Sequence, residues 1–284
     1  MASLFNPDYL LSLCKKYNLT PSKQYGQNYL IDEAVIEKII TAAEIHDNDA
    51  VVEVGPGFGA LTLTLAAKAK QVISFEIEKK LLPYWEEKQK HFPNIQIEWG
   101  NVLYQFASTA LTLPSGYKVV ANLPYQITSP VIRLFLETEK TPAEMIFMVQ
   151  KEVAERLAAK PGDMSLLAVS AQYYASVQMV TIVPRTAFWP SPAVDSAVIK
   201  IISKHEPRNN EFERIFFSFV RAGFANRRKL LFKNLLPVVG KKNKVEFEKV
   251  FNELKLLPTA RAQELSIEQW KELAKKCSFF TSVK

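Results

Sequence analysis

Five short apolar runs, each followed by a stretch with helical periodicity, limit what this chain can fold into. The runs are AVVEV (50–54), QVISF (71–75), IQIEW (95–99), YKVVA (117–121) and EMIFMV (144–149). Strands that alternate with single helices are typical of βαβ units, because a parallel neighbour is reached only through a crossover connection. The sequence therefore predicts an α/β fold, in which a mostly parallel sheet carries helices on both faces.

The pattern changes after the fifth run. Residues 171–183 and 196–202 predict two longer strands with little helix between them, which would close the sheet as a hairpin. A polar break, HEPRNN (205–210), follows, and the rest of the chain has helical periodicity. We therefore predict one domain over residues 1–203 and a small helical domain over residues 204–284.

Positive charge is concentrated in the last third of the chain. Residues 201–284 hold 18 Lys and Arg against 9 Asp and Glu, whereas residues 1–200 hold 18 against 20. Because phosphates are bound largely by Lys and Arg, this distribution indicates a polyanionic partner. A solvated basic surface without a partner is the alternative interpretation.

The sequence shows no membrane, export or metal signal. No apolar run approaches the ~18 residues of a membrane-spanning helix, and the first residues lack the pattern of a secretory signal. The two cysteines, Cys14 and Cys277, form no CxxC pair. These features predict a cytoplasmic protein with free thiols and no metal site. Without an exposed heptad repeat, a monomer is expected.

A glycine-rich turn follows the first predicted strand, in VVEVGPGFGALT (51–62). Gly55, Gly57 and Gly59 let the backbone turn sharply and approach a ligand closely, since no Cβ stands in the way. Glu76 ends the second predicted strand, 21 positions after Gly55, where a carboxylate can accept both hydroxyls of a ribose. Together they indicate a cofactor that carries adenosine, either a nicotinamide dinucleotide or S-adenosylmethionine. A purely structural tight turn is the remaining alternative.

The segment ANLPYQITSP (121–130) lies where the fourth predicted strand ends. An exocyclic adenine amine is a poor nucleophile because its lone pair is delocalised into the ring, so a methylating enzyme must hold its N–H groups with acceptors. The side-chain oxygen of Asn122 and the backbone carbonyl of Leu123 can be those acceptors. Pro124 stiffens the turn, and Tyr125 offers a ring face to a flipped base. A hydride-transfer site needs no such segment, so the pattern favours methylation of an adenine amine.

Several segments match one known family in order over about 200 residues. They are YGQNYLID (25–32), EVGPGFGALT (53–62), FEIEKKL (75–81), ANLPYQITSP (121–130), MVQKEVAERL (148–157), FWPSPAVDSAV (188–198) and VRAGFANRRKLL (220–231). On these segments the chain resembles the ribosomal RNA adenine dimethyltransferases, and most of all their bacterial small-subunit branch. The resemblance implies a Rossmann-like domain that uses S-adenosylmethionine, and a helical C-terminal domain that helps to hold RNA. The implied reaction dimethylates the N6 amines of two adjacent adenines in a 3′-terminal hairpin of small-subunit ribosomal RNA, within the 30S particle, with a role in small-subunit biogenesis.

The resemblance also implies roles by position. Asn28 and Leu30 would contact the methionine end of the cofactor, Glu76 its ribose and Asn101 its adenine. The residues implied in cofactor binding are Gln27, Asn28, Leu30, Gly55, Gly57, Glu76, Asn101 and Asn122. The catalytic set would be Asn122, Leu123, Pro124, Tyr125 and Phe188, with the target amine held by Asn122 and Leu123 and the target base enclosed by Tyr125 and Phe188.

The basic segment RAGFANRRKLLFK (221–233) contains five basic residues and no acidic one. Helical spacing predicts Arg221 and Arg228 on one face, with Phe224 and Leu231 on another. We expect the phosphate contacts from the basic side chains alone, namely Arg221, Arg227, Arg228 and Lys229.

Three features depart from the family's pattern. The family usually has aspartate where this chain has Asn101, and commonly has lysine where this chain has Ala193. Its Tyr-Gly-Arg-Leu-Ser loop is replaced by Met-Ser-Leu-Leu-Ala at 164–168, which lacks an arginine and a glycine. These departures predict altered cofactor affinity and altered RNA contacts around an intact chemical centre.

Other interpretations stay open on the sequence. A large-subunit ribosomal RNA adenine methyltransferase of the macrolide-resistance type is disfavoured by VDSAV (194–198). A DNA adenine methyltransferase is disfavoured by Leu123, where its motif has proline. A ribosome assembly factor with weak or lost methylation is the alternative from another class, and a dehydrogenase leaves residues 121–125 unexplained. The number of methyl groups per adenine and the order of the target bases are not predicted.

Overall fold

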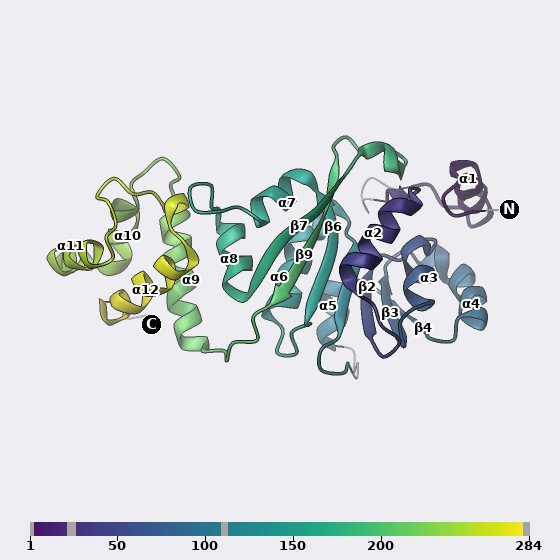
Figure 1. Ribbon diagram of the computed structural model, residues 1–284, viewed down its shortest axis with the longest axis horizontal. Coiled ribbons are helices and arrows are strands. Elements are labelled where there is room, and N and C mark those ends of the chain that lie inside the picture. Colours follow the sequence, from purple (N-terminus) through teal and green to yellow (C-terminus); the bar gives the residue numbers. More distant parts are fainter. Residues whose placement is uncertain (1–2, 22–26, 109–112, 281–284) are drawn as a thin grey trace. The chain divides into compact units, whose positions relative to one another are not determined.

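The computed structural model describes residues 3–21, 27–108 and 113–280 (Figure 1). Helices and strands alternate through the first half of the chain, and the described residues after Ser203 contain helices without strands. This order of elements confirms the predicted α/β fold with helices at its C-terminal end.

The chain divides into two compact units, which we describe separately. The first comprises residues 1–154 and 176–203, and the second comprises residues 155–175 and 204–284. The sequence-based boundary after residue 203 coincides with the last passage of the chain between the units. It did not anticipate that residues 155–175 group with the C-terminal helices, because such grouping depends on tertiary contacts.

A seven-stranded sheet forms the centre of the first unit, in the order β4-β3-β2-β5-β6-β9-β7. Strands β2 to β6 pair in parallel, whereas β9 is antiparallel to β6. A separate antiparallel pair joins β1 to β8. The bounds are β1 (Tyr29–Leu30), β2 (Ala50–Val54), β3 (Gln71–Glu76), β4 (Ile95–Trp99), β5 (Lys118–Asn122), β6 (Glu144–Gln150), β7 (Ala175–Val183), β8 (Phe188–Trp189) and β9 (Ser196–Ser203). The five apolar runs therefore became the five parallel strands, as predicted.

Helices cover both faces of this sheet (Figure 1). One face carries α2 (Glu33–Ala43), α3 (Ala60–Ala66) and α4 (Leu82–His91), with α1 (Pro7–Lys16) packed on the same core. The other face carries α5 (Val102–Ser108) and α6 (Thr128–Glu137). The short helix α7 (Lys151–Leu157) follows β6 directly.

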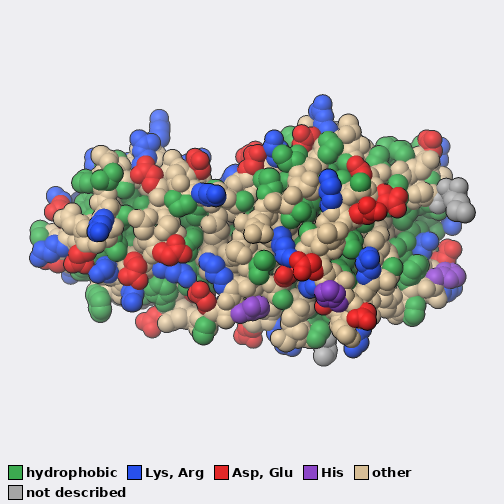
Figure 2. Space-filling model, viewed as in Figure 1, with side chains coloured by type: hydrophobic (Ala, Val, Ile, Leu, Met, Phe, Trp, Pro, Cys, Tyr) green, Lys and Arg blue, Asp and Glu red, His purple; other side chains and the backbone are tan. Residues whose placement is uncertain are grey.

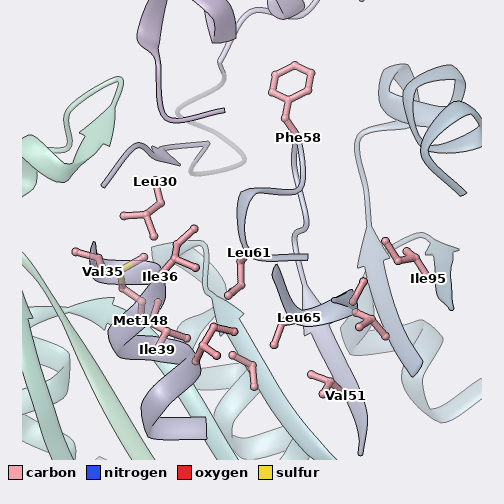
Figure 3. Packing of buried hydrophobic residues seen from close by; sticks show 14 of the residues in the cluster. Leu30, Val35, Ile36, Ile39, Val51, Phe58, Leu61, Leu65, Ile95 and Met148 are labelled. Atoms are coloured by element: carbon pink, nitrogen blue, oxygen red, sulfur yellow. The ribbon is translucent and has the colours of Figure 1, made fainter. Parts of the chain in front are cut away.

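A largely aliphatic hydrophobic core fills the first of these faces, with a few aromatic rings such as that of Phe58 (Figure 3). Alternate residues of a strand point to the same face, so Ile146 and Met148 of β6 both contribute to it. Figure 3 shows Ile36 and Ile39 of α2 directed into this core, at the spacing that aligns side chains on one side of a helix. The same core supports the glycine turn, because Phe58 of that turn is buried in it.

Aromatic rings fill the opposite face. The ring centroids of Phe106 and Phe135, on α5 and α6, are 4.9 Å apart in an edge-to-face arrangement. Phe147 of β6 lies 6.4 Å from Phe135, and Phe75 of β3 lies 6.1 Å from Phe106. These contacts tie both helices to the sheet just below the carboxyl ends of β3 and β6.

Among the described residues of the second unit, five α-helices pack around their own core. They are α8 (Leu166–Tyr174), α9 (Asn210–Phe224), α10 (Leu231–Val239), α11 (Lys244–Glu253) and α12 (Ile267–Cys277). Phe216 and Phe219 of α9, Leu235 of α10, Phe247 of α11 and Trp270 of α12 are fully buried. This hydrophobic core gives the exposed basic side chains of the unit a stable support.

Helix α8 corrects one prediction. Residues 171–174 were expected to begin a strand, but they end a helix, and the strand starts only at Ala175. The hydroxyl of Ser165 caps this helix by accepting from the N–H of Ala168 at 3.1 Å. The Gln172 amide donates to the carbonyl of Leu157 at 2.9 Å, a contact that local periodicity cannot reveal. The departure at 164–168 thus supplies a helix cap in this protein.

Within the described part of the chain, no helix is long and apolar enough to cross a membrane. The same residues contain no group of three or more His, Cys, Asp or Glu side chains that could hold a metal ion. Cys14 and Cys277 are both buried free thiols.

Truncation of Phe135 tests the aromatic core. Phe135→Ala removes a fully buried ring from between Phe106 and Phe147, and we expect it to lower the free energy of unfolding by about 3–5 kcal/mol. Denaturant unfolding measures the loss. Ile182→Ala, at a side chain that is 50% exposed, should change the stability by less than about 0.5 kcal/mol. Equal effects of the two variants would contradict this account of the core.

Candidate cofactor and target-base site

A pocket opens in the first unit at the carboxyl ends of β2, β3, β4 and β5. Open parallel sheets bind their ligands at this edge, because the loops that leave the strands converge there. The pocket wall brings together every residue predicted for cofactor binding, although they are spread over nearly a hundred positions. These are Gln27, Asn28, Leu30, Gly55, Gly57, Glu76, Asn101 and Asn122.

The glycine turn between β2 and α3 lines the pocket, and three of its five residues have no Cβ. Gly57 and Gly59 have φ angles of +54° and +88°, which other residues rarely adopt. A Cβ on Gly59 would lie 2.8 Å from the ring of Trp85, too close for an alanine. Helix α4 holds the turn, since Trp85 Nε1 donates to the carbonyl of Gly57 at 3.1 Å and the Tyr84 hydroxyl donates to that of Phe58 at 2.6 Å. The close approach of the backbone to a ligand is therefore built into the fold.

Glu76, at the end of β3, faces this turn with a positioned carboxylate. The N–H of Gly57 donates to its Oε2 at 3.1 Å, and the N–H of Glu78 donates to its Oε1 at 2.8 Å. Burial raises the pKa of Glu76, and the backbone donors act in the opposite direction. Each oxygen keeps further acceptor capacity, which suits a pair of ribose hydroxyls.

Glu53 is a second carboxyl in the pocket wall, and the sequence assigned it no definite role. It is only 2% exposed, and the Ser74 hydroxyl donates to its Oε2 at 2.7 Å. Burial raises the pKa of Glu53 to about 7, against the effect of that hydrogen bond. This carboxyl therefore changes its protonation close to neutral pH, next to the glycine turn.

Asn101, which replaces the family's usual aspartate, follows β4 and lines the pocket. Its Oδ1 accepts from the N–H of Leu103 at 3.0 Å, at the start of α5. An asparagine in this position offers Nδ2 as a donor, whereas an aspartate would offer only acceptors. The departure thus changes the hydrogen-bonding character of this wall while keeping the helix start intact.

Asn122 ends β5 and is oriented by the segment that carries Asn28. Its Nδ2 donates to the backbone carbonyl of Asn28 at 3.3 Å. Because a carbonyl can only accept, this contact assigns the amide nitrogen to Asn28 and leaves Oδ1 as an acceptor for another group. The next residue is also anchored, since the N–H of Leu123 donates to the carbonyl of Met148 at 3.1 Å. Pro124 completes this part of the pocket wall.

Tyr125 lies beside the pocket wall and is held by β9. Its hydroxyl is 2.8 Å from the Ser196 hydroxyl, and either oxygen can be the donor. Burial raises the pKa of Tyr125, so the phenol stays protonated at neutral pH. The ring is half-buried and anchored at its far end, which is a favourable arrangement for stacking.

Phe188, by contrast, is enclosed in the core. Its side chain is 3% exposed, and its backbone pairs with that of Leu30 through the β1–β8 ribbon. The structure therefore does not place an open face of Phe188 opposite Tyr125. The neighbouring Trp189 is more exposed and stacks on Tyr29 with ring centroids 6.3 Å apart. Phe188 belongs to the hydrophobic core of the first unit, and the sequence predicted neither this burial nor the β1–β8 ribbon.

The predicted RNA-binding residues lie in the second unit, and all four are exposed. Arg221 is on α9, but that helix ends at Phe224, so Arg227, Arg228 and Lys229 lie in the turn before α10. The predicted single helical face that contains Arg221 and Arg228 is therefore wrong. Figure 2 shows Lys and Arg side chains distributed over the helices of this unit on the face in view.

Several residues that shape the pocket were missed by sequence reasoning. Tyr84 and Trp85 lie within α4, and nothing in a helical pattern indicates that they hydrogen-bond to a turn some 27 residues earlier. Ser74 and Ser196 lie inside strands, where a serine usually carries no signal. Only knowledge of the register between β2 and β3 could have identified Ser74 as the partner of Glu53, because the two residues pair directly across these strands.

The fold and the site together define the class of the protein. A glycine-rich turn, the Glu76 carboxylate that faces it and the polar side chains of Asn101 and Asn122 in the pocket wall fit S-adenosylmethionine. The insertion of antiparallel β9 beside β6 departs from the six-stranded parallel order of dinucleotide-binding dehydrogenases. The chain has the fold and site of a Rossmann-like methyltransferase that uses S-adenosylmethionine.

Comparison with known proteins agrees with this class and narrows it. Residues 18–278 match the model of the family described as ribosomal RNA adenine dimethylase. A protein of Dehalococcoides mccartyi named ribosomal RNA small subunit methyltransferase A is 42% identical, over 90% of this chain and 88% of its own length. A protein of the same name from a Geobacillus species is 41% identical, over 94% of this chain and 95% of its own length.

Two solved structures are similar throughout. A dimethyladenosine transferase from Plasmodium falciparum has a TM-score of 0.75 and 27% identity, covering 86% of this chain and 95% of its own. The 23S rRNA methyltransferase ErmE has a TM-score of 0.71 and 29% identity, covering 88% of this chain and 99% of its own. The chain belongs to the ribosomal RNA adenine dimethylase family, and S-adenosylmethionine is its methyl donor.

Glu53 predicts a pH dependence of stability. Its pKa is about 7 in the folded protein against 4.5 for an unperturbed carboxyl, so the folded state binds the extra proton between these values. Stability should therefore fall as the pH rises through this window. Glu53→Gln should remove the contribution of Glu53 to this dependence and exceed the wild type in stability at pH 8 by up to about 3 kcal/mol, with little difference near pH 4.5. Urea unfolding at both pH values measures this, with Glu86→Gln as an exposed control. Parallel profiles for the wild type and Glu53→Gln would contradict it.

Glu76 predicts a loss of cofactor affinity. Glu76→Gln keeps the shape of the side chain but has one acceptor oxygen for the two N–H groups that now donate to it. We expect the Kd for S-adenosylmethionine to rise at least about tenfold, the equivalent of one good hydrogen bond. Isothermal titration calorimetry measures it, with Glu78→Gln as the control because that carboxyl does not line the pocket. An unchanged Kd would remove Glu76 from the ribose site.

Proposed function

We propose that this protein transfers methyl groups from S-adenosylmethionine to the N6 amines of two adjacent adenines in a 3′-terminal hairpin of small-subunit ribosomal RNA. The observation that carries this proposal is the hydrogen bond from Asn122 to the Asn28 carbonyl in the pocket wall. It places an oriented amide acceptor, from an Asn-Leu-Pro-Tyr segment, beside the residues that would hold the cofactor.

Different residues of the pocket would contact different parts of the cofactor. We assign the methionine end to Gln27, Asn28 and Leu30, since these adjoin Asn122 through the Asn28 carbonyl. The glycine turn would contact the centre of the molecule. The Glu76 carboxylate would accept the ribose hydroxyls, and Asn101 would meet the adenine.

The reaction needs an amine whose lone pair is available. When bound, S-adenosylmethionine supplies an electrophilic methyl group. The Oδ1 of Asn122 and the carbonyl of Leu123 would each accept one N–H of the target amine, which draws the lone pair out of conjugation with the ring. No strong base is required, because the amine becomes acidic once it is methylated and can lose its proton afterwards. Most of the rate enhancement would come from positioning, which contributes about 7–11 kcal/mol in well-oriented systems.

The base would be held by stacking. Tyr125 is anchored through its hydroxyl to Ser196, so its ring can receive an extruded adenine without first losing much conformational freedom. Phe188 is 3% exposed in the core. It can act as the second ring of this site only if its side chain moves out of the core. Trp189, next to it, is the more accessible aromatic side chain.

The choice of the small subunit is supported by the relatives. Proteins named as small-subunit methyltransferases are 41–42% identical to this chain, whereas the 23S enzyme ErmE is 29% identical. The basic residues of the second unit would bind the phosphates of the RNA. Such a substrate implies action in the cytoplasm on the 30S particle, and we expect a monomer to carry it out. The second candidate is a ribosome assembly factor with weak or lost methylation. It is suggested by the change to Asn101, and the relatives named as methyltransferases do not favour it.

Asn122→Ala tests the chemistry. Without the amide acceptor, we expect methyl transfer to fall by at least about 10²-fold while the Kd for S-adenosylmethionine stays within about threefold. The assay measures labelled methyl transfer to small subunits that lack adenine methylation, with large-subunit RNA and duplex DNA in parallel. Asn94→Ala is the control, because it also removes an amide that donates to backbone carbonyls, but Asn94 does not line the pocket.

The labelled nucleoside decides between the functions. Dimethyladenosine on the small subunit alone supports the proposal, and label on large-subunit RNA alone would replace it by the sister activity. Tight binding of small subunits without any label would identify an assembly factor. Near-normal activity of Asn122→Ala would contradict the proposal that Asn122 activates the target amine.

A further inference from the structure

The turn that joins α9 to α10 carries three consecutive cations. We call residues 226–229, Asn-Arg-Arg-Lys, the basic turn. All four side chains are exposed, and none of the ion pairs among the described residues involves Arg227, Arg228 or Lys229. Uncompensated cations in a row repel one another, so they are stabilised by a polyanion more than by water.

A buried amide holds this turn from beneath. Asn234, on the first turns of α10, is 8% exposed. Its Nδ2 donates to the carbonyl of Gly223 at 2.7 Å and to the carbonyl of Asn226 at 3.0 Å. Carbonyls at the end of a helix lack partners within the helix, so this single side chain both caps α9 and fixes the first residue of the basic turn. The N–H of Lys229 donates to the same Asn226 carbonyl at 3.0 Å and closes the turn.

Packing fixes both ends of the turn as well. On the α9 side, Gly223 lies so close to Trp270 that a Cβ would be 2.4 Å from its ring. Phe224 stacks on the same Trp270 with ring centroids 5.8 Å apart. On the α10 side, the N–H of Leu231 donates to the carbonyl of Ala260 at 2.8 Å. The backbone between these anchors is therefore determined by contacts that include no charged side chain.

We infer that Asn234 is a positioning residue for RNA binding, which holds the basic turn in a preformed phosphate-binding conformation. The inference rests on the proposed function, since it takes the polyanion to be ribosomal RNA. The physical reason is preorganisation, because a turn that is already ordered loses less conformational entropy when its cations meet phosphates. A buried amide suits this task, since it donates to two carbonyls without adding a charge that would compete with the phosphates.

The chain provides a matched control for the test. Asn94 uses its Nδ2 in the same way, donating to the carbonyls of Ala66 at 2.8 Å and Ala69 at 3.1 Å at the end of α3. Asn94→Ala therefore removes two equivalent hydrogen bonds from a helix end in the first unit, where the nearby cations Lys68 and Lys70 are not consecutive. Asn234→Ala and Asn94→Ala should both lower the melting temperature, and only the former should change RNA binding.

The experiment measures the affinity of the full-length protein for a transcript of small-subunit ribosomal RNA between about 50 and 200 mM salt. Each phosphate contact contributes about −0.7 to −0.9 to the slope of log K against log salt. Arg227→Ala/Arg228→Ala should flatten the slope by about two such contacts. Asn234→Ala, which removes no charge, should weaken binding about tenfold at low salt and flatten the slope by at least one contact. In the Arg227→Ala/Arg228→Ala background, Asn234→Ala should cause little further loss.

A merely structural role for Asn234 would give a different result in these measurements. Asn234→Ala would then lower the melting temperature while the folded protein kept the wild-type slope, and that outcome would overturn the inference. Additive losses in the combined variant would also overturn it, because coupling is its main requirement. If Asn234→Ala does not fold, Asn226→Gly loosens the exposed turn without touching a buried group and should flatten the slope in the same way.

Failure of the proposed function is distinguishable from failure of this inference. An unchanged slope in Arg227→Ala/Arg228→Ala would move the RNA surface away from the basic turn and end the inference, while methyl transfer to small subunits could persist. Loss of methyl transfer from the wild type, with the slopes behaving as described, would leave the basic turn as an RNA-binding element of a protein without the activity.

Discussion

Parallel pairing of β2 with β3 and β5 is the constraint on which the site depends. It brings the carboxyl ends of these strands to one edge, so the glycine turn, Glu76 and Asn122 meet there although they lie far apart in the sequence. The β2–β3 register also pairs Glu53 with Ser74. A slip of one residue would turn every side chain to the other face, and would dismantle the core and the pocket together.

The site also lowers the stability of the fold, since it buries two carboxyl groups, Glu53 and Glu76, in the pocket wall. Glu76 is offset by backbone N–H donors, and Glu53 has the Ser74 hydroxyl. The remaining cost appears as a raised pKa for both groups. A protein that keeps such groups gives up some stability at neutral pH, which is understandable where the carboxyls face a ligand.

Both units contain the same type of hydrogen bond, in which a side-chain amide donates to backbone carbonyls. Asn122 donates to Asn28 and thereby presents its oxygen, while Asn234 donates to Gly223 and Asn226 and thereby shapes a turn. In each case the amide is held by groups that carry no charge. The chemistry of the pocket and the binding of phosphates can therefore be separated experimentally by changing one asparagine at a time.

The sequence by itself determined the alternation of strands and helices, the glycine turn, Glu76 and the Asn122–Tyr125 segment, because these depend on local periodicity and on short motifs with a definite chemistry. Residue patterns could not predict that residues 155–175 join the C-terminal helices, that α9 ends at Phe224, or that Phe188 is buried in the core. Nor could they predict Tyr84 and Trp85 as supports of the glycine turn. Each of these depends on a partner far away in the chain. Burial and hydrogen bonding between distant residues are decided only when the whole structure has formed.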